Sequence, residues 1–371
     1  MSDAAKQGFG AASRSMIVLA ASAASRSMIV LAAFVIVIAG MRSAAPILVP
    51  FLLAVFIATI AEAPVAWLRD RKVPGALAIT LVMLAMVVLL IAIGALIAQS
   101  VDGFGSQLPF YKERLTSITA DLLGWLTPYA ETFGIDLTTD ALLAFFDPAV
   151  VLDVVRNALS SLGSVLGNGF LILLTVIFIL AEVSSFPAKL RRAIREPAPD
   201  FDRFASFGDT VNRYMAIKTT ISAITGILAA SGLALLGVDF PLLWGLLTFL
   251  LNFVPTIGSI IAAIPPVLLA LVQLGPFAAV LVAVGFLMLN IVMGSAVEPR
   301  FMGRGLGLST LVVFLSLVFW GWVLGPVGML LSIPLTMTAK MALEASPSSR
   351  WLAQLLGPAP GPDPKPSDEA A

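Results

Sequence analysis

The sequence contains no cysteine and no histidine among its 371 residues, and only 12% of the residues are charged. Without cysteine there are no disulfides and no thiol nucleophiles, and without either residue the usual Cys/His zinc sites and Ser-His-Asp hydrolysis are excluded. The G-x-x-x-x-G-K-[ST] phosphate loop is absent too, which argues against ATP-driven transport by this chain. We therefore predict no enzyme activity, no cofactor and no metal site.

What the sequence has in excess is apolar residues, which make up 59% of the chain. A soluble domain carries about 25% charged residues, roughly twice the fraction found here. The composition therefore indicates an integral membrane protein. Lys and Arg together number 22, as do Asp and Glu, so the net charge provides no attraction to nucleic acid and we predict no such partner.

Hydrophobic runs predict an all-α polytopic fold with about six full transmembrane helices. Each run approaches the length of about 20 residues that a helix needs to cross a bilayer. The first run starts near residue 27, and the others cover Ala45 to Ile60, Gly75 to Ala98, Val165 to Ala181, Met215 to Leu236 and Pro276 to Val297.

Two further apolar regions, 241–273 and 308–341, are interrupted by glycine and proline. The first contains the stretch NFVPTIGSIIAAIPP, in which Pro255, Gly258 and Pro265 stand where a spanning helix would carry Leu or Val. Prolines remove backbone donors, and lipid cannot satisfy the groups that a helix break frees. Such a break must face protein or a water-filled cavity, so this stretch is a candidate substrate path.

The two broken regions resemble each other at a shift of 70 residues. Gly237 and Gly258 are 21 residues apart, as are Gly307 and Gly328, and the second region continues to an equivalent proline at Pro334. Arms of about 16 residues reach roughly 24 Å, less than the hydrocarbon core of about 30 Å. Two re-entrant hairpins forming an inverted repeat fit these lengths, and the alternative is two ordinary kinked helix pairs with chance similarity.

The distribution of Lys and Arg predicts the orientation, because basic loops stay in the cytoplasm. Three basic residues lie within 69–72 and seven within 185–218, whereas the loop 99–163 carries eight acidic residues against three basic ones. Both termini are then cytoplasmic. The predicted divisions are a cytoplasmic N-terminus 1–26, transmembrane helices 1 to 3 within 27–98, an extracytoplasmic amphipathic helical loop 99–163, helix 4 within 164–184, a cytoplasmic interfacial segment 185–214, a transport core 215–342 and a cytoplasmic disordered tail 343–371.

The N-terminus carries a direct repeat, ASRSMIVLAA, at residues 12–21 and 24–33. Its period of 12 residues is too short for a structural repeat of the usual kind, so we interpret it as a local duplication.

Polar residues inside apolar segments are the functional candidates, since they are expensive in a membrane. Asn252 and Asn290 could bind a polar solute or join helices. Glu62 and Glu298 are candidates for ion coupling or simple solvation near helix ends. Glu298 precedes Arg300 and Arg304, so an ion-paired hinge or inner-face topogenic charge would both fit. Lys218 starts a helix and is predicted to snorkel to the interface.

At these motifs the sequence resembles the AI-2E (autoinducer-2 exporter) family, whose members are also described as PerM-like permeases. The resemblance lies in NFVPTIGSIIAAIPPVLLAL, VEPRFMGRGLGLSTLVVFLSLVFWGWVLGPVGMLLSIPL and FLLAVFIATIAEAPVAWLRDRKVP. It implies a multi-pass protein of the bacterial cytoplasmic (inner) membrane and a homo-oligomer, with the pentamer as a candidate form. Thr256 and Ser259 differ from the aromatic residue and proline of many relatives, which leaves the solute open.

Three functions follow from these observations. The first is a secondary transporter or exporter of a small polar organic solute, with autoinducer-2 implied by the resemblance. The second is a sodium (cation)/proton antiporter, which the scarcity of carboxylates inside the predicted helices disfavours. The third is a non-transporting membrane scaffold.

Overall fold

The structure is a computed structural model, and it describes residues 28–29, 31–132, 153–154, 157, 169–183, 200–255, 257–302, 307–345 and 349–358. Every regular element within these ranges is a helix, which confirms the all-α prediction. The longer helices are α2 (Ala45–Asp70), α3 (Gly75–Thr132), α6 (Gly169–Val183), α8 (Asp200–Leu236), α9 (Pro241–Leu251), α10 (Ile257–Leu274), α11 (Pro276–Asn290), α13 (Thr310–Leu330) and α14 (Ser332–Ala345). Three short elements complete the set: the π-helix η1 (Ile291–Val297), α12 (Glu298–Met302) and α15 (Arg350–Leu355).

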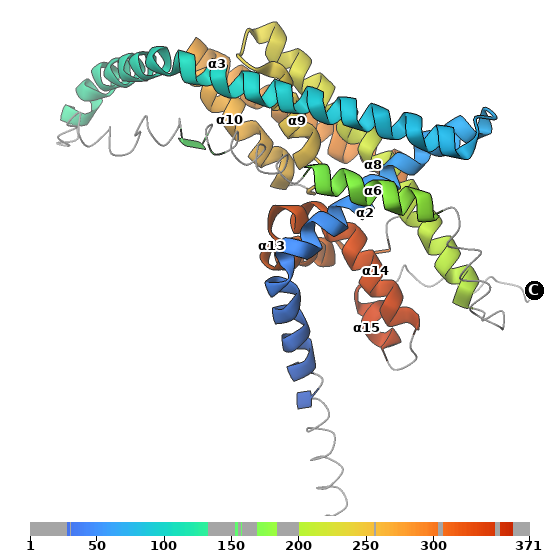
Figure 1. Ribbon diagram of the computed structural model, residues 1–371. Coiled ribbons are helices and arrows are strands. Elements are labelled where there is room, and N and C mark those ends of the chain that lie inside the picture. Colours follow the sequence, from blue (N-terminus) through green and yellow to red (C-terminus); the bar gives the residue numbers. More distant parts are fainter. Residues whose placement is uncertain are drawn as a thin grey trace, which may run out of the picture.

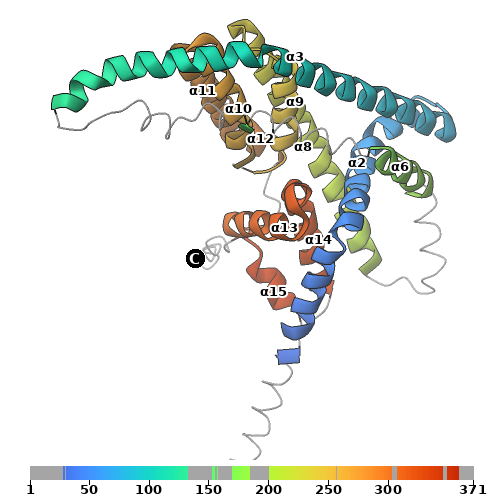
Figure 2. The same cartoon turned by 60° about the vertical axis from the view of Figure 1, so that its left-hand side comes forward.

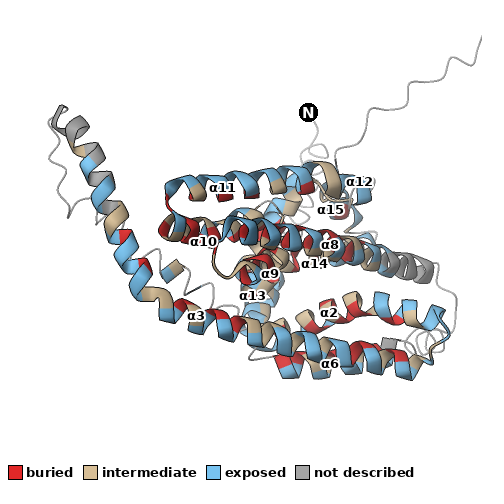
Figure 3. Ribbon diagram, turned by 90° about the horizontal axis from the view of Figure 1, so that it is seen from above, coloured by how far each residue is buried: buried red, intermediate tan, exposed pale blue. Residues whose placement is uncertain are grey.

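The helices form two groups on either side of α2 and α8. α3 lies along one side of the molecule with α9 and α10 packed against it, α11 packs on α10, and α13, α14 and α15 lie on the opposite side (Figures 1 and 2). α8 runs from the first group toward the second. α8 packs chiefly against α9, whereas α11 and much of α3 present exposed faces (Figure 3). Exposed apolar faces of this kind suit contact with lipid.

Among the described residues, six helices are long and apolar enough to cross a membrane. The number of membrane-length helices agrees with the prediction, but the helices are not all the predicted ones. The arms Ile257–Leu274 and Thr310–Leu330 qualify, whereas the apolar helices Leu31–Ser43 and Gly169–Glu182 are shorter than 18 residues. The hairpin regions therefore contribute more membrane-length helix than their proline content predicts.

The first two predicted crossings are joined without a reversal of the chain. The Ala44 amide donates to the Gly40 carbonyl at 2.9 Å, and the Leu48 amide donates to the Ala44 carbonyl at 2.9 Å. The N-terminal helix therefore runs on into α2 (Figure 2). The prediction of separate helices rested on separate apolar runs, but a drop in hydrophobicity is not a turn. The Arg42 guanidinium instead lies 4.7 Å from the centre of the Trp322 ring in α13.

α3 extends without a break from the predicted third crossing into the predicted outer loop. No helix end occurs at the predicted boundary between residues 98 and 99. Similarly, α8 begins at Asp200 and passes through the predicted boundary at residues 214–215 into its membrane-length part. The amphipathic segments at these boundaries therefore continue the membrane-length helices. The side of the membrane on which each segment lies stays a prediction.

α8 and α9 approach closely through glycine. A Cβ added to Gly226 would lie 2.6 Å from the Gly245 carbonyl oxygen, and one added to Gly245 would lie 2.7 Å from the Ala230 Cβ. Small residues allow helix backbones to meet in a membrane, where dispersion contacts hold helices together. This contact fixes the first hairpin, α9 and α10, against α8.

A polar cluster ties α3 to the start of this hairpin. The buried Tyr111 hydroxyl donates to Asp239 Oδ2 at 2.7 Å, and Trp244 Nε1 donates to the Asp239 carbonyl at 2.9 Å. Phe240 occupies the left-handed region with φ 58°, and its ring fills the space above Gly103 of α3. The extension of α3 is therefore bound to the transport core rather than separate from it.

We expect Tyr111→Phe to destabilise the protein by about 1.5–3 kcal/mol, because it removes a hydrogen bond to a charged acceptor. Thermal unfolding of the purified protein in detergent measures the effect. Thr116→Val in the same helix is the control, since that hydroxyl only donates to the Lys112 carbonyl on an exposed surface. Equal melting temperatures for the two variants would contradict the expected role of Tyr111.

Candidate functional site: two hairpins and a polar face of α8

The first hairpin consists of α9 and α10, and residues 252–255 lie in the turn that follows α9. Gly258 lies directly after the turn, where an added Cβ would overlap the carbonyl oxygen of Leu251. Pro265 does not interrupt the helix, because α10 continues through Pro265 and Pro266. Both prolines are buried. Neighbouring helices surround this part of α10, and prolines inside membrane helices are tolerated in such surroundings.

The second hairpin consists of α13 and α14. It turns a few residues before Gly328, the glycine that the sequence pattern singled out. The non-helical residue is Gly325, with φ 69° and ψ −154°, followed by Pro326. Gly328 is helical, and an added Cβ there would overlap the Trp320 carbonyl oxygen. Pro334 lies in the first turn of α14, where a missing amide hydrogen is harmless. Gly258 and Gly328 thus share a role as the point of closest backbone approach after each turn.

The open ends of the two hairpins are also alike. Each hairpin is preceded by a glycine with positive φ, 77° at Gly237 and 66° at Gly307. A side chain from the returning arm donates to the carbonyl of that glycine. Gln273 Nε2 donates to Gly237 at 3.0 Å, and Lys340 Nζ donates to Gly307 at 2.6 Å. These parallels are consistent with the predicted repeat, while its re-entrant and inverted character stays a prediction.

The first hairpin turn and the returning arm of the second hairpin meet in one buried cluster, which we call the tip cluster. It consists of Phe56 from α2, Tyr214 and Met215 from α8, Phe253 from the first turn, and Leu331, Ile333 and Met337 from the second hairpin. Phe253 packs edge-on against Phe56 and Phe249, with ring centroids 5.3 Å and 5.6 Å apart. The tip cluster closes the space between the hairpins with apolar side chains.

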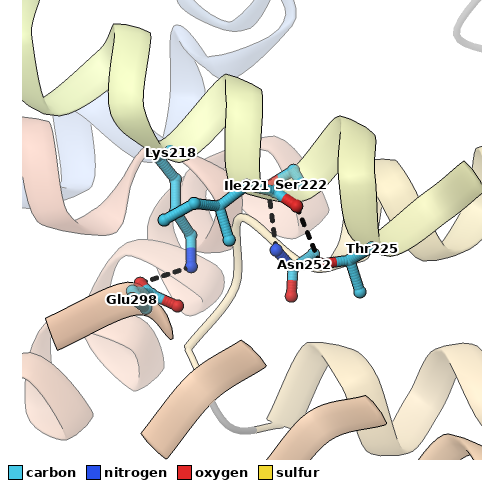
Figure 4. Close-up of polar contacts among 6 residues, drawn as sticks. All are labelled: Lys218, Ile221, Ser222, Thr225, Asn252 and Glu298. Atoms are coloured by element: carbon cyan, nitrogen blue, oxygen red, sulfur yellow. Dashed lines mark hydrogen bonds and ion pairs between the residues drawn. The ribbon is translucent and has the colours of Figure 1, made fainter. Parts of the chain in front are cut away.

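Beside the tip cluster, α8 carries a buried polar face made of Lys218, Ser222 and Thr225. The three side chains lie three or four residues apart and therefore on one side of the helix. Ser222 is 0% exposed, and its hydroxyl accepts a hydrogen bond from Asn252 Nδ2 at 2.9 Å (Figure 4). Thr225 donates to the Ile221 carbonyl at 2.7 Å. Asn252, predicted as a site residue, thus joins the first hairpin turn to α8.

At one end of this face, Lys218 forms an ion pair with Glu298. The two are 2.6 Å apart between Lys218 Nζ and Glu298 Oε1, and their side chains are 3% and 24% exposed (Figure 4). Lys218 does not snorkel, contrary to prediction, because a carboxylate 80 residues further along the chain reaches it inside the protein. Glu298 follows the π-helix η1, and such wide turns occur frequently at functional sites.

The remaining predicted residues lie apart from this ion pair. Asn212 Nδ2 donates to Glu62 at 3.4 Å, which joins α8 to α2. Asn290 ends α11 and is half-buried, and among the described residues its side chain makes no hydrogen bond. Arg300 is exposed on α12, and Arg304 lies outside the described residues. The predicted hinge therefore pairs Glu298 with Lys218, not with Arg300.

Known proteins are similar to this chain along most of its length. The profile of the family described as AI-2E family transporter matches residues 29–348. The chain belongs to the AI-2E transporter family. The AI-2 transport protein TqsA of Escherichia coli K12 is 44% identical over 322 residues, which cover 87% of this chain and 92% of TqsA. A candidate transport protein of Haemophilus influenzae is 40% identical over 329 residues, covering 88% of this chain and 94% of that protein.

A third AI-2E relative, the candidate transport protein YhhT of Escherichia coli K12, is 39% identical over 324 residues, covering 87% of this chain and 92% of YhhT. The family assignment makes this chain a membrane transporter and not an enzyme, in agreement with the prediction. Its bacterial relatives and multi-pass fold are consistent with a bacterial inner membrane.

Sequence reasoning missed three features of this AI-2E transporter: the partner of Lys218, the polar face around Ser222, and the contact of Arg42 with Trp322. A signal for the second was present in the chain, because Lys218, Ser222 and Thr225 recur at helical spacing within an apolar run. The other two depend on contacts between distant segments, which helical spacing does not encode.

Proposed function

We propose that this AI-2E family transporter is a secondary transporter or exporter that moves a small polar organic solute along the polar face of α8 and past the two hairpin turns. The observation that carries the proposal is the hydrogen bond between Asn252 and Ser222. It places an amide and a hydroxyl, which can each donate and accept, beside the point where the hairpins meet. The printed name of TqsA, an AI-2 transport protein, makes autoinducer-2 the first solute to test.

The experiment is flux into liposomes that contain the purified protein. Autoinducer-2 uptake and sodium-dependent pH change are measured in parallel, with protein-free liposomes as the background. Autoinducer-2 movement without a sodium-dependent pH change supports the proposal. Sodium-driven proton movement would overturn it, and the absence of both fluxes favours a membrane scaffold.

We expect Asn252→Ala and Ser222→Ala each to lower solute flux about tenfold, which corresponds to about 1.4 kcal/mol and to the loss of one hydrogen bond. Thr220→Ala on the exposed side of α8 is the matched control, because its hydroxyl donates to the Ala216 carbonyl. Flux that falls equally in the control would show that the helix, and not the polar face, had been disturbed.

A second candidate, cation/proton antiport, is supported by the Lys218–Glu298 pair, because it places a carboxylate against a buried ammonium group. Ionisable residues inside membrane proteins often serve proton or ion pathways. We rank it second because Glu298 is held by Lys218 and lies at the end of the polar face. Among the described residues, no group of three or more Asp and Glu side chains is placed to hold a metal ion.

The proposal also includes the orientation of the protein in the membrane and its oligomeric state. We place both termini in the cytoplasm and the protein in a homo-oligomer, with the pentamer as a candidate form. Mass determination in detergent tests the oligomer. Because the chain has no cysteine, single introduced cysteines report the side of each loop without background labelling.

A further inference from the structure

Two hydroxyl groups are buried without any hydrogen-bond partner in the part of the chain that the structure describes. They are Thr219 Oγ1 in α8 and Ser332 Oγ at the start of α14. Ser332 is 0% exposed. Buried hydroxyls are nearly always hydrogen-bonded, and each one left unpaired costs about 1–3 kcal/mol.

Other hydroxyls in these helices avoid this cost by bonding to their own backbone. Thr225, Thr248, Ser316 and Thr338 each donate to the carbonyl of the residue four positions earlier, at 2.6–2.8 Å. The same bond is the ordinary solution for Ser and Thr inside a helix. The unpaired state of Ser332 and Thr219 therefore requires a specific explanation.

Both hydroxyls lie next to the tip cluster, one on α8 and the other on α14. Ser332 stands between Leu331 and Ile333, two members of the cluster. Thr219 lies one helical turn after Met215, a third member, and directly after Lys218. The apolar tip cluster thus has one unpaired hydroxyl beside it on α14 and another on α8.

We propose that Ser332 and Thr219 are solute-contact residues, which the tip cluster covers when the hairpins are closed. Their ligand is an uncharged, oxygen-rich molecule whose hydroxyl or carbonyl groups supply the missing hydrogen bonds. Two hydroxyls can each donate and accept, whereas they provide no charge to hold an ion. The proposal rests on the proposed function and adds two residues that determine solute specificity.

The first test compares stability with transport in Ser332→Ala. Removing an unpaired hydroxyl leaves stability unchanged or raises it, whereas removing a solute contact lowers autoinducer-2 flux in liposomes, by about tenfold for one hydrogen bond. Ser316→Ala is the control, because its equally small hydroxyl is bonded to the Val312 carbonyl at 2.6 Å. Its flux stays at the wild-type level. A lower melting temperature with normal flux in Ser332→Ala overturns the proposal.

The second position is tested with Thr219→Val, which keeps the shape of the side chain, against Thr220→Val on the exposed side of the same helix. We expect reduced flux in the first variant only. Wild-type flux in Thr219→Val would remove Thr219 from the proposed site.

A labelling experiment keeps this test separate from the test of the proposed function. Ser332→Cys and Thr219→Cys in the otherwise cysteine-free protein are treated in liposomes with a hydrophilic thiol reagent. We expect both to react during transport and autoinducer-2 to slow the reaction. If wild-type protein moves no autoinducer-2, the proposed function fails for that solute. If wild-type protein does move autoinducer-2, reaction of both cysteines without protection by it, or no reaction at all, overturns this proposal and leaves the proposed function standing.

Discussion

Glu298→Gln is expected to destabilise the protein by about 3–5 kcal/mol and to abolish transport, because it leaves the Lys218 ammonium group charged and without its partner at a site that is 2% exposed. Lys218→Met should lower the stability less, since the Glu298 side chain is 24% exposed and can reach water. Thermal unfolding in detergent and flux in liposomes measure the two effects.

The double variant Lys218→Met with Glu298→Gln separates structure from function. Replacing both members of a buried ion pair is often neutral for stability, so the double variant should melt close to the wild type. Its transport should nevertheless stay lost if the charges take part in the cycle. Normal transport in the stable double variant would show that the pair is structural only.

Gly258→Ala and Gly328→Ala are expected to be the most damaging small substitutions in the hairpins. In each case the new methyl group would overlap a backbone carbonyl oxygen, of Leu251 or Trp320, and no change of rotamer relieves that overlap. Overpacking of this kind costs about 1–3 kcal/mol, and more where backbone meets backbone. We expect loss of flux together with a lower melting temperature for both.

Gly285→Ala in α11 is the matched control, because nothing lies within 4 Å of an added Cβ there. Alanine inside a helix is more favourable than glycine by about 0.5–1 kcal/mol, so this variant should be as stable as the wild type or slightly more so. A Gly258→Ala protein that melts and transports like Gly285→Ala would mean that the hairpin turns are looser than the structure shows.

Much of the fold was predictable because membrane solvation imposes simple rules on sequence. Apolar run lengths predicted the helical class, and the combination of Asn252 with Pro255 located the first hairpin turn. Proline was a weak guide to the breaks, because Pro265 lies inside α10 and Pro334 lies in the first turn of α14. The effect of a proline depends on its position in the helix and on what surrounds it.

The candidate site was less predictable, because its chemistry arises between segments that are far apart in the chain. Lys218 looked like an interfacial residue when only its own helix was considered, and its partner is contributed by α12. The unpaired hydroxyl of Ser332 is a property of packing, which no local pattern contains. Arg42, likewise, gains its aromatic partner Trp322 only when the N-terminal helix meets α13.

The π-helix η1 has a consequence for sequence alignment within the family. Its wide turns accommodate an extra residue relative to a regular α-helix, and each residue turns an α-helix by about 100°. A relative that lacks one residue in 291–297 would therefore present a different side of the following helix to α8. Identity at position 298 would then not imply the same ion pair, so length in this short segment is as informative about the site as residue type.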